Sequence, residues 1–175
     1  WSPLNSGNCN AYYLMGKPPI GTSPYNPTGF QHPRTGNNLI ETQFYCNTCK
    51  RVYPRNTLKQ TLKSNTTYCA KYYLVCTNYS PLAIDSYGMY FSNSTIDTIS
   101  KCAIPLTYLT PQIENQNGII TDTLNWVPIS GTFVATGSEK YIVLGNFKSN
   151  LTTNTITLIS TPASLTVLSS DIYID

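Results

Sequence analysis

Hydrophobic and polar residues alternate with a period of two along much of the chain, which is the pattern of β-strands. The clearest case is the run Thr67–Thr77. One face of this run would carry Tyr68, Ala70, Tyr72, Leu74 and Cys76, and the other Cys69, Lys71, Tyr73, Val75 and Thr77. Because only the second face includes a charged residue, the pattern predicts a strand covered on one side and partly covered on the other.

Similar short runs recur on both sides of this strand. We expect strands at Leu39–Tyr45, Thr57–Leu62, Asp85–Ser92, Leu106–Ile113, Leu124–Pro128, Ile129–Ala135, Glu139–Phe147, Thr155–Ile159 and Asp171–Asp175. Asn117-Gly118 and Thr136-Gly137-Ser138 have the composition of hairpin-type turns. Apolar residues at helical spacing are scarce. About eight to ten strands with almost no helix predict an all-β fold, an antiparallel β-sandwich whose form is a jelly roll.

Residues 1–38 have a different composition, dominated by Gly, Pro, Asn, Ser and Tyr. This density of turn-forming residues leaves no room for a long helix, so we expect a long irregular N-terminal segment that wraps the domain. The chain of 175 residues has the length of one domain, and it shows no internal repeat and no linker. We therefore predict a single β-sandwich domain over 1–175.

The composition removes several classes of function. Only 11% of the residues are charged, against about 25% in an ordinary soluble domain, and 24 Thr, 16 Ser and 17 Asn take their place. A net charge of +3 without basic runs predicts no nucleic-acid partner and no binding to an acidic membrane. No apolar stretch approaches the roughly 18–20 residues needed to span a bilayer, so we expect no direct membrane insertion.

Six cysteines, an even number, favour an oxidising, extracytoplasmic setting. The candidates for disulfides are Cys9, Cys46, Cys49, Cys69, Cys76 and Cys102. The two-residue gap between Cys46 and Cys49 also occurs in zinc knuckles and in thioredoxin-like redox motifs. A second pair at similar spacing is absent, and the turn-like sequence around this pair does not open a helix, so disulfides are the favoured interpretation. The pairing cannot be read from the sequence.

An ordered series of motifs resembles a known family. The motifs are His32–Asn37, Leu58–Leu62, Thr67–Cys69, Ala83–Phe91, Pro111–Asn115, Ile120–Trp126, Ile129–Gly137, Glu139–Ile142, Gly145–Phe147 and Tyr173–Asp175. Together they resemble the carbohydrate-binding-module-like jelly-roll domain of secreted Bacteroidota surface proteins. That group includes proteins described as gliding-motility-associated, as OmpA-like, and as cargo of the type IX secretion system.

The resemblance implies a galactose-binding-like jelly roll exported to the cell surface. In that family an additional strand precedes the region of Trp1, and the last strand continues past Asp175, so we expect 1–175 to be a fragment of a longer exported protein. Related domains hold a structural calcium ion with an acidic residue of the last strand, which makes Asp175 the candidate ligand here. A solvated terminal carboxylate is the alternative for that residue, because calcium takes about six to eight oxygens. The Bacteroidota pattern for O-glycosylation matches at Thr98 and Thr123.

Carbohydrate-binding jelly rolls bind sugars with exposed aromatic rings and neighbouring polar groups. The C–H face of a sugar packs on an apolar ring, and the polar groups hydrogen-bond its hydroxyls. The candidate ligand-binding residues are the loop aromatics Tyr12, Tyr13, Tyr25, Tyr45, Tyr53 and Tyr79, with Asn10, Asn26 and Arg34 as polar partners. Packing inside the sandwich is the alternative for each single tyrosine.

Catalysis is disfavoured, because the only imidazole, His32, lies before a proline in a turn, and no two acidic residues form a recognisable pair. We expect no enzyme but an extracellular, non-catalytic module for adhesion or for binding a glycan or another surface component. The alternative is a structural building block of a surface appendage or filament without a small ligand, which the low surface charge favours through weak self-repulsion.

Overall fold

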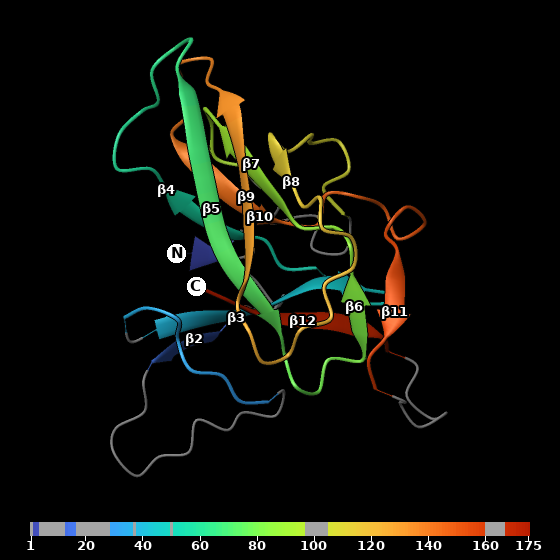
Figure 1. Cartoon of the computed structure of the whole chain (residues 1–175). Helices are drawn as coiled ribbons and strands as arrows, with labels where there is room; N and C mark the ends of the chain where they lie inside the picture. The colour runs from blue at the N-terminus through green and yellow to red at the C-terminus, as the bar shows by residue number, and fades with distance from the viewer. Residues whose placement is uncertain are drawn as a thin grey trace.

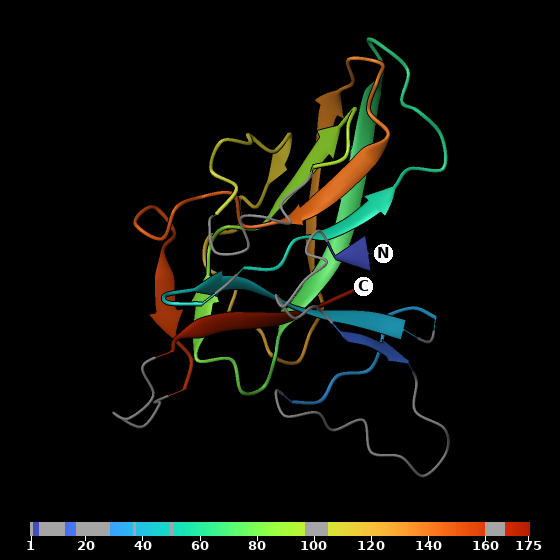
Figure 2. The ribbon, with the colours of Figure 1, turned by 180° about the vertical axis from the view of Figure 1, so that it is seen from behind.

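The computed structural model describes residues 2–3, 13–16, 29–36, 38–49, 51–96, 105–159 and 167–175, the first two ranges and residue 38 through their backbone only. Within these ranges the protein has strands and no helix, so no helix is present that could cross a membrane. Two layers of strands face each other (Figure 1), and the view from behind shows β3 and β12 running across below β4 and β10 (Figure 2).

Each layer is an antiparallel five-stranded sheet. The first sheet has the order β1 (Ser2–Pro3), β4 (Pro54–Thr57), β10 (Tyr141–Gly145), β7 (Gly88–Ser92) and β8 (Ile113–Glu114). The second has the order β2 (Tyr13–Gly16), β3 (Asn38–Cys46), β12 (Ser169–Ile174), β5 (Thr67–Cys76) and β9 (Val127–Val134). A small third sheet pairs β6 (Leu82–Ile84) with β11 (Thr155–Thr157). Because the chain passes repeatedly from one sheet to the other, the predicted antiparallel sandwich of jelly-roll type is confirmed.

The core lies between the two sheets. The second sheet contributes Phe44, Leu74, Ile129 and Ile172, and the first contributes Met89, Phe91 and Leu144. All of these side chains are buried. Apolar side chains at every second position of the facing strands therefore supply the sandwich with its main source of stability.

Strand β5 confirms the alternation that its sequence predicts. Tyr72, Leu74 and Cys76 on the inner face are buried, whereas Cys69 and Lys71 on the outer face are exposed. The outer face becomes buried toward the end of the strand, where Val75 packs with Leu39, Tyr173 and the half-buried Trp126.

Two of the predicted strands are wrong. Strand β4 ends at Thr57, and residues 58–62 form a loop whose Leu58 and Leu62 pack against the core, so their spacing reflects burial without strand pairing. In 106–113 only the last residue lies in a strand, β8, because Pro105 and Pro111 lack the N–H group that a sheet needs.

The predicted strands Leu124–Pro128 and Ile129–Ala135 are replaced by one strand, β9, which spans Val127–Val134. It tolerates Pro128 because it lies at the edge of its sheet and pairs only with β5. Strands β1 and β2 lie inside the segment that was expected to be irregular throughout, and β2 pairs with the first residues of β3. Turns are present at both predicted positions, since Gly118 and Gly137 have φ of 71° and 101°, values that favour glycine. Neither turn is a hairpin, because β8 pairs with β7, whereas β9 and β10 lie in different sheets.

Candidate functional site

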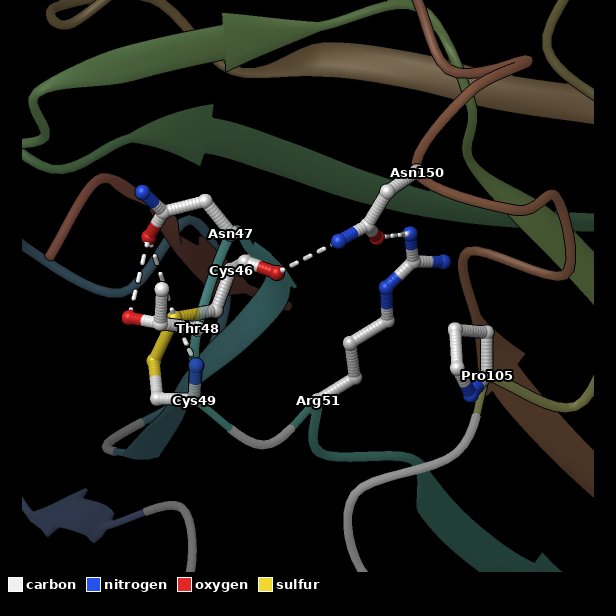
Figure 3. A pocket seen from close by; sticks show the side chains of 7 residues that line it. All are labelled: Cys46, Asn47, Thr48, Cys49, Arg51, Pro105 and Asn150. Atoms are coloured by element: carbon white, nitrogen blue, oxygen red, sulfur yellow. Dashed lines mark hydrogen bonds between the residues drawn. A yellow bond between two sulfur atoms is a disulfide. The ribbon is translucent and has the colours of Figure 1, made fainter.

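A pocket of about 130 Å³ opens where the chain turns back after β3. Its walls come from the turn 46–49, the segment after it, and two loops that are distant in sequence. The lining residues are Cys46, Asn47, Thr48, Cys49, Arg51, Pro105 and Asn150 (Figure 3). Amides, a hydroxyl and a guanidinium thus share one small concavity with a disulfide and a proline ring.

The disulfide Cys46–Cys49 closes the turn at the rim, with the two Cα atoms 5.2 Å apart. The bond favours a disulfide over a zinc site for this pair, since both sulfurs are used in it. The backbone N–H of Cys49 also donates to Sγ of Cys46 at 2.9 Å. Among the described residues no group of three or more His, Cys, Asp or Glu side chains gathers that could hold a metal ion.

Cys69 and Cys76 are free thiols, so the prediction of a disulfide at these two residues is wrong. They lie on opposite faces of β5, and seven residues of extended chain separate their Cα atoms by about 23 Å, whereas a disulfide needs less than about 7 Å. Cys69 is exposed, and burial raises the pKa of the Cys76 thiol to about 12. Cys9 and Cys102 lie outside the described residues.

Long-range hydrogen bonds hold the two asparagines of the pocket. The backbone N–H of Leu168 donates to Oδ1 of Asn47 at 2.8 Å, and the N–H of Asn47 donates to the carbonyl of Leu168 at 3.0 Å, which ties the turn to the start of β12. From the opposite wall, Nδ2 of Asn150 donates to the carbonyl of Cys46 at 3.1 Å. The pocket is therefore held together by hydrogen bonds between segments about a hundred residues apart.

Arg51 forms the floor between these walls and is only 4% exposed. Its Nη1 donates to the carbonyls of Asn146 at 3.0 Å and Lys148 at 2.6 Å, and its Nη2 donates to Oδ1 of Asn150. Its Nε is shielded from solvent and has no hydrogen-bond partner. Desolvation lowers the pKa of the guanidinium, which also lies over the ring of Tyr45 at 5.4 Å from the ring centroid. All three acceptors of this buried cation are neutral.

Asn146 and Tyr53 support the arginine from below. The hydroxyl of Tyr53 donates to the same Asn146 carbonyl at 2.8 Å and accepts from the N–H of Leu106 at 3.1 Å. The fully buried side chain of Asn146 accepts from the N–H of Lys148 and donates to the hydroxyl of Thr153. This network fixes the carbonyl groups that orient Arg51.

The structure corrects part of the predicted aromatic site. Tyr53 is 3% exposed and Tyr45 is 9% exposed, so both rings belong to the interior and present no face to a sugar. Their neighbours explain this, because Tyr53 packs with Phe147 and Tyr45 lies under Arg51. Tyr79 is 63% exposed, as a ligand-binding ring requires. Tyr12, Tyr25, Asn10, Asn26 and Thr98 lie outside the described residues, and Tyr13 is described only as a backbone position of β2.

Arg34 and Asp175 lie together on the outer face of the second sheet, away from the lining of the pocket. The guanidinium carbon of Arg34 lies 3.8 Å from the centroid of the Tyr73 ring. Asp175, whose backbone pairs with that of Tyr73, accepts hydrogen bonds at its two carboxylate oxygens from the N–H and hydroxyl of Thr35, at 2.9 and 2.7 Å. Calcium binding by Asp175 stays a prediction, as does glycosylation of the half-buried Thr123.

Several acidic side chains are engaged in local structural bonds. Burial acts to raise the pKa of Glu139, but hydrogen bonds from Thr136 and Gly137 outweigh it and hold that pKa at about 2. Hydrogen bonds from the N–H of Asn125 and neighbouring groups lower the pKa of Asp122. Burial raises the pKa of Asp171, which accepts from Ser169 and Gln43.

Sequence reasoning missed the pocket and its central residue. Arg51 was not singled out, and the partners of its guanidinium are 95 to 99 positions away. The available signal was the pair of cations Lys50-Arg51 between the Cys46–Cys49 turn and the apolar pair Val52-Tyr53, where a charge next to an apolar run is unexpected.

Comparisons with known proteins give little further guidance. No protein-family model matches the chain, and no curated protein matches it. Among solved structures, the chain is similar to the CBM22-1 xylan-binding domain of Xyn10C from Paenibacillus barcinonensis. The two share 12% sequence identity over 99% of this chain and 86% of that chain, with a TM-score of 0.45. A similarity of this size carries no inference about a ligand, so the function has to be argued from the pocket itself.

Proposed function

We propose that this domain is a non-catalytic glycan-binding module, and that the pocket beside the Cys46–Cys49 turn is its binding site. The observation that carries the proposal is the composition of the pocket wall. Amide, hydroxyl and guanidinium groups of Asn47, Thr48, Arg51 and Asn150 can hydrogen-bond sugar hydroxyls, while the disulfide and the ring of Pro105 offer apolar surface to the C–H groups of the sugar.

The size of the pocket decides how much of a glycan it takes. Sites for drug-sized ligands measure about 300–1,000 Å³, whereas this pocket measures about 130 Å³. It therefore accepts one sugar unit or one substituent of a longer chain. For so small a contact we expect weak binding, with a dissociation constant on the order of 1 mM, which is about −4 kcal/mol.

The absence of carboxylates from the seven lining residues supports binding over hydrolysis. Glycoside hydrolysis commonly uses two carboxylic acids that flank the scissile bond. Asp85 and Glu139, two of the carboxylates in the described part of the chain, are engaged by Asn154 and by the Thr136 turn respectively. The proposal thus assigns the pocket to attachment.

The disulfide supports an extracytoplasmic location, because such bonds persist in oxidising compartments. In this proposal the domain attaches its parent protein to a glycan on a cell surface or in the surrounding medium. The surface proteins that its motifs resemble are also secreted to the outside of the cell.

The test is binding of sugars to the 175-residue chain, followed by NMR chemical-shift changes, with two matched variants. Thr48→Trp places a large ring at the rim of the pocket, and Thr132→Trp places the same ring on the exposed outer face of β9. We expect Thr48→Trp to abolish binding and Thr132→Trp to leave it unchanged. The proposal fails if a broad panel of neutral and acidic oligosaccharides shows no binding at millimolar concentration. The assignment to this pocket fails if Tyr79→Ala abolishes binding while Thr48→Trp does not.

A second candidate function, assembly with other copies or chains, is favoured by the outer face of β5 and β9. Cys69, Lys71, Ser130, Thr132 and Val134 are all exposed there, and β9 is an edge strand. Unpaired edge strands are sites where another chain can add to a sheet. Sedimentation velocity across protein concentration and salt tests this function, and a sedimentation coefficient that stays at the monomer value throughout would exclude it.

A further inference from the structure

The guanidinium of Arg51 is a buried cation, and its hydrogen-bond partners among the described residues are all neutral. A guanidinium has five N–H donors, and three of them are used by the carbonyls of Asn146 and Lys148 and the amide oxygen of Asn150. The Nε–H and one hydrogen of Nη2 remain. In Figure 3 the guanidinium lies between Asn150 and Pro105, with Nε on the side of the disulfide turn.

A buried charge without a counter-charge is unusual, because removing an ion from water is costly and proteins generally pair such groups. Dipoles of carbonyl groups offset part of this cost at Nη1. No carboxylate is among the described residues that line the pocket, so none of them compensates the positive charge of Arg51. Lys148, whose backbone carbonyl accepts from Nη1, adds a second cation to the same loop.

The two unused donors are chemically suited to an oxyanion. The Nε and Nη2 groups of a guanidinium lie along one edge and can bind two oxygens of a carboxylate or a sulfate in parallel, an arrangement stronger than a neutral hydrogen bond. At an effective dielectric constant of about 20, an anion about 4 Å from the guanidinium attracts it far more strongly than in bulk water. Sugar hydroxyls supply no such charge.

We propose that the glycan taken by this pocket is acidic, and that the carboxylate or sulfate group of one sugar unit binds Arg51 through Nε and Nη2. This inference rests on the proposed function and narrows its ligand class. In this structure the Nε–H is shielded from solvent and Oδ1 of Asn150 accepts from Nη2, so the oxyanion reaches this edge as Asn150 gives up that bond. Asn47 and Thr48 on the rim contact the hydroxyls of the same unit.

The ligand itself provides the first test. Binding of four probes to the unmodified 175-residue chain is compared by calorimetry: a galacturonic acid trimer, the same trimer with methyl-esterified carboxyl groups, a neutral galactose trimer, and a sulfated galactose trimer. We expect at least one acidic probe to bind about tenfold or more tightly than the uncharged probes, with an affinity that falls as salt is raised from about 0.1 to 1 M. The ratio of the dissociation constants of the carboxylated and sulfated trimers shows which of the two oxyanions the pocket prefers.

The protein variants provide the second test. Arg51→Lys keeps the charge but loses the parallel two-donor edge, and we expect it to weaken binding of the acidic probe about tenfold and binding of the neutral trimer by less. Lys140→Gln removes one exposed charge away from the pocket and should leave the affinity for the acidic probe unchanged. Because Arg51 also supports the loop, thermal unfolding of each variant is measured alongside.

The outcomes separate this inference from the proposed function. If the esterified and neutral trimers bind as tightly as the acidic ones, the acidic ligand class is overturned while glycan binding stands. If the acidic probe binds more tightly but Arg51→Lys has no effect, the assignment to Arg51 is overturned. If none of the probes and no other glycan binds, the proposed function fails and this inference fails with it.

Discussion

Two buried tyrosines that differ in hydrogen bonding lead to opposite expectations for the same chemical change. Tyr53→Phe removes a hydroxyl that donates to the carbonyl of Asn146 at 2.8 Å and accepts from the N–H of Leu106 at 3.1 Å. Tyr72→Phe removes a hydroxyl that is buried and has no hydrogen-bond partner. Both rings stay in place, so the pair isolates the effect of the hydroxyl group.

The magnitudes follow from the groups left behind. In Tyr53→Phe the Asn146 carbonyl keeps its bond from Arg51, but the buried N–H of Leu106 loses its partner. A net hydrogen bond contributes about 1 kcal/mol and an orphaned buried donor costs about 1–3 kcal/mol, so we expect a loss of about 2–3 kcal/mol in the free energy of unfolding. In Tyr72→Phe an unpaired polar group leaves the core, and we expect no loss and a gain of up to about 1 kcal/mol.

Urea unfolding followed by tyrosine and tryptophan fluorescence measures both values, with the slope m checked for constancy so that only stability is compared. Equal destabilisation of the two variants would refute the reasoning, because it would mean that the hydroxyl bonds seen around Tyr53 have no energetic weight. Tyr53→Phe should also weaken ligand binding, since it loosens the carbonyl that orients Arg51.

Three further predictions concern the loops. Gly137→Ala should destabilise the domain by about 1 kcal/mol or more beyond Gly118→Ala in chemical denaturation, because both residues have positive φ but only at Gly137 would a Cβ lie 2.6 Å from a side-chain carbon; equal losses would contradict this. The pKa of Glu139 is lowered from 4.5 to about 2, so its contribution to stability is present above its unfolded pKa and is lost as the pH falls toward 2. In Glu139→Gln the unfolding free energy should therefore depend less on pH between about 5 and 2, and an unchanged pH profile would count against the Thr136 bonds. Replacing Cys46 and Cys49 together by serine should cost about 2 kcal/mol for so short a loop and weaken ligand binding, measured by calorimetry on the same samples; unchanged affinity would show that the turn does not shape the pocket.

The class of fold was predictable because it depends on local pattern. The period of two in Thr67–Thr77 requires one covered face, and the structure buries Tyr72, Leu74 and Cys76 on that face. Likewise Gly118 and Gly137 mark turns, because few other residues adopt positive φ at low cost. The predicted strand Leu106–Ile113 was wrong because Pro105 and Pro111 lack the N–H groups of a sheet, and Leu106 and Leu109 pack from a loop instead.

The candidate site was not predictable, because it is made by contacts between segments that no local pattern connects. The sequence by itself determined an all-β chain, the turn positions, a low-charge surface and a closely spaced cysteine pair. Only the tertiary structure decided that this pair is bonded, that Cys69 and Cys76 are free, and that Tyr45 and Tyr53 turn inward. It also decided that Arg51 is enclosed by groups nearly a hundred residues away. The physical reason is that burial and hydrogen bonding of a side chain depend on which distant strands and loops pack against it, and that packing is settled only when the two sheets come together.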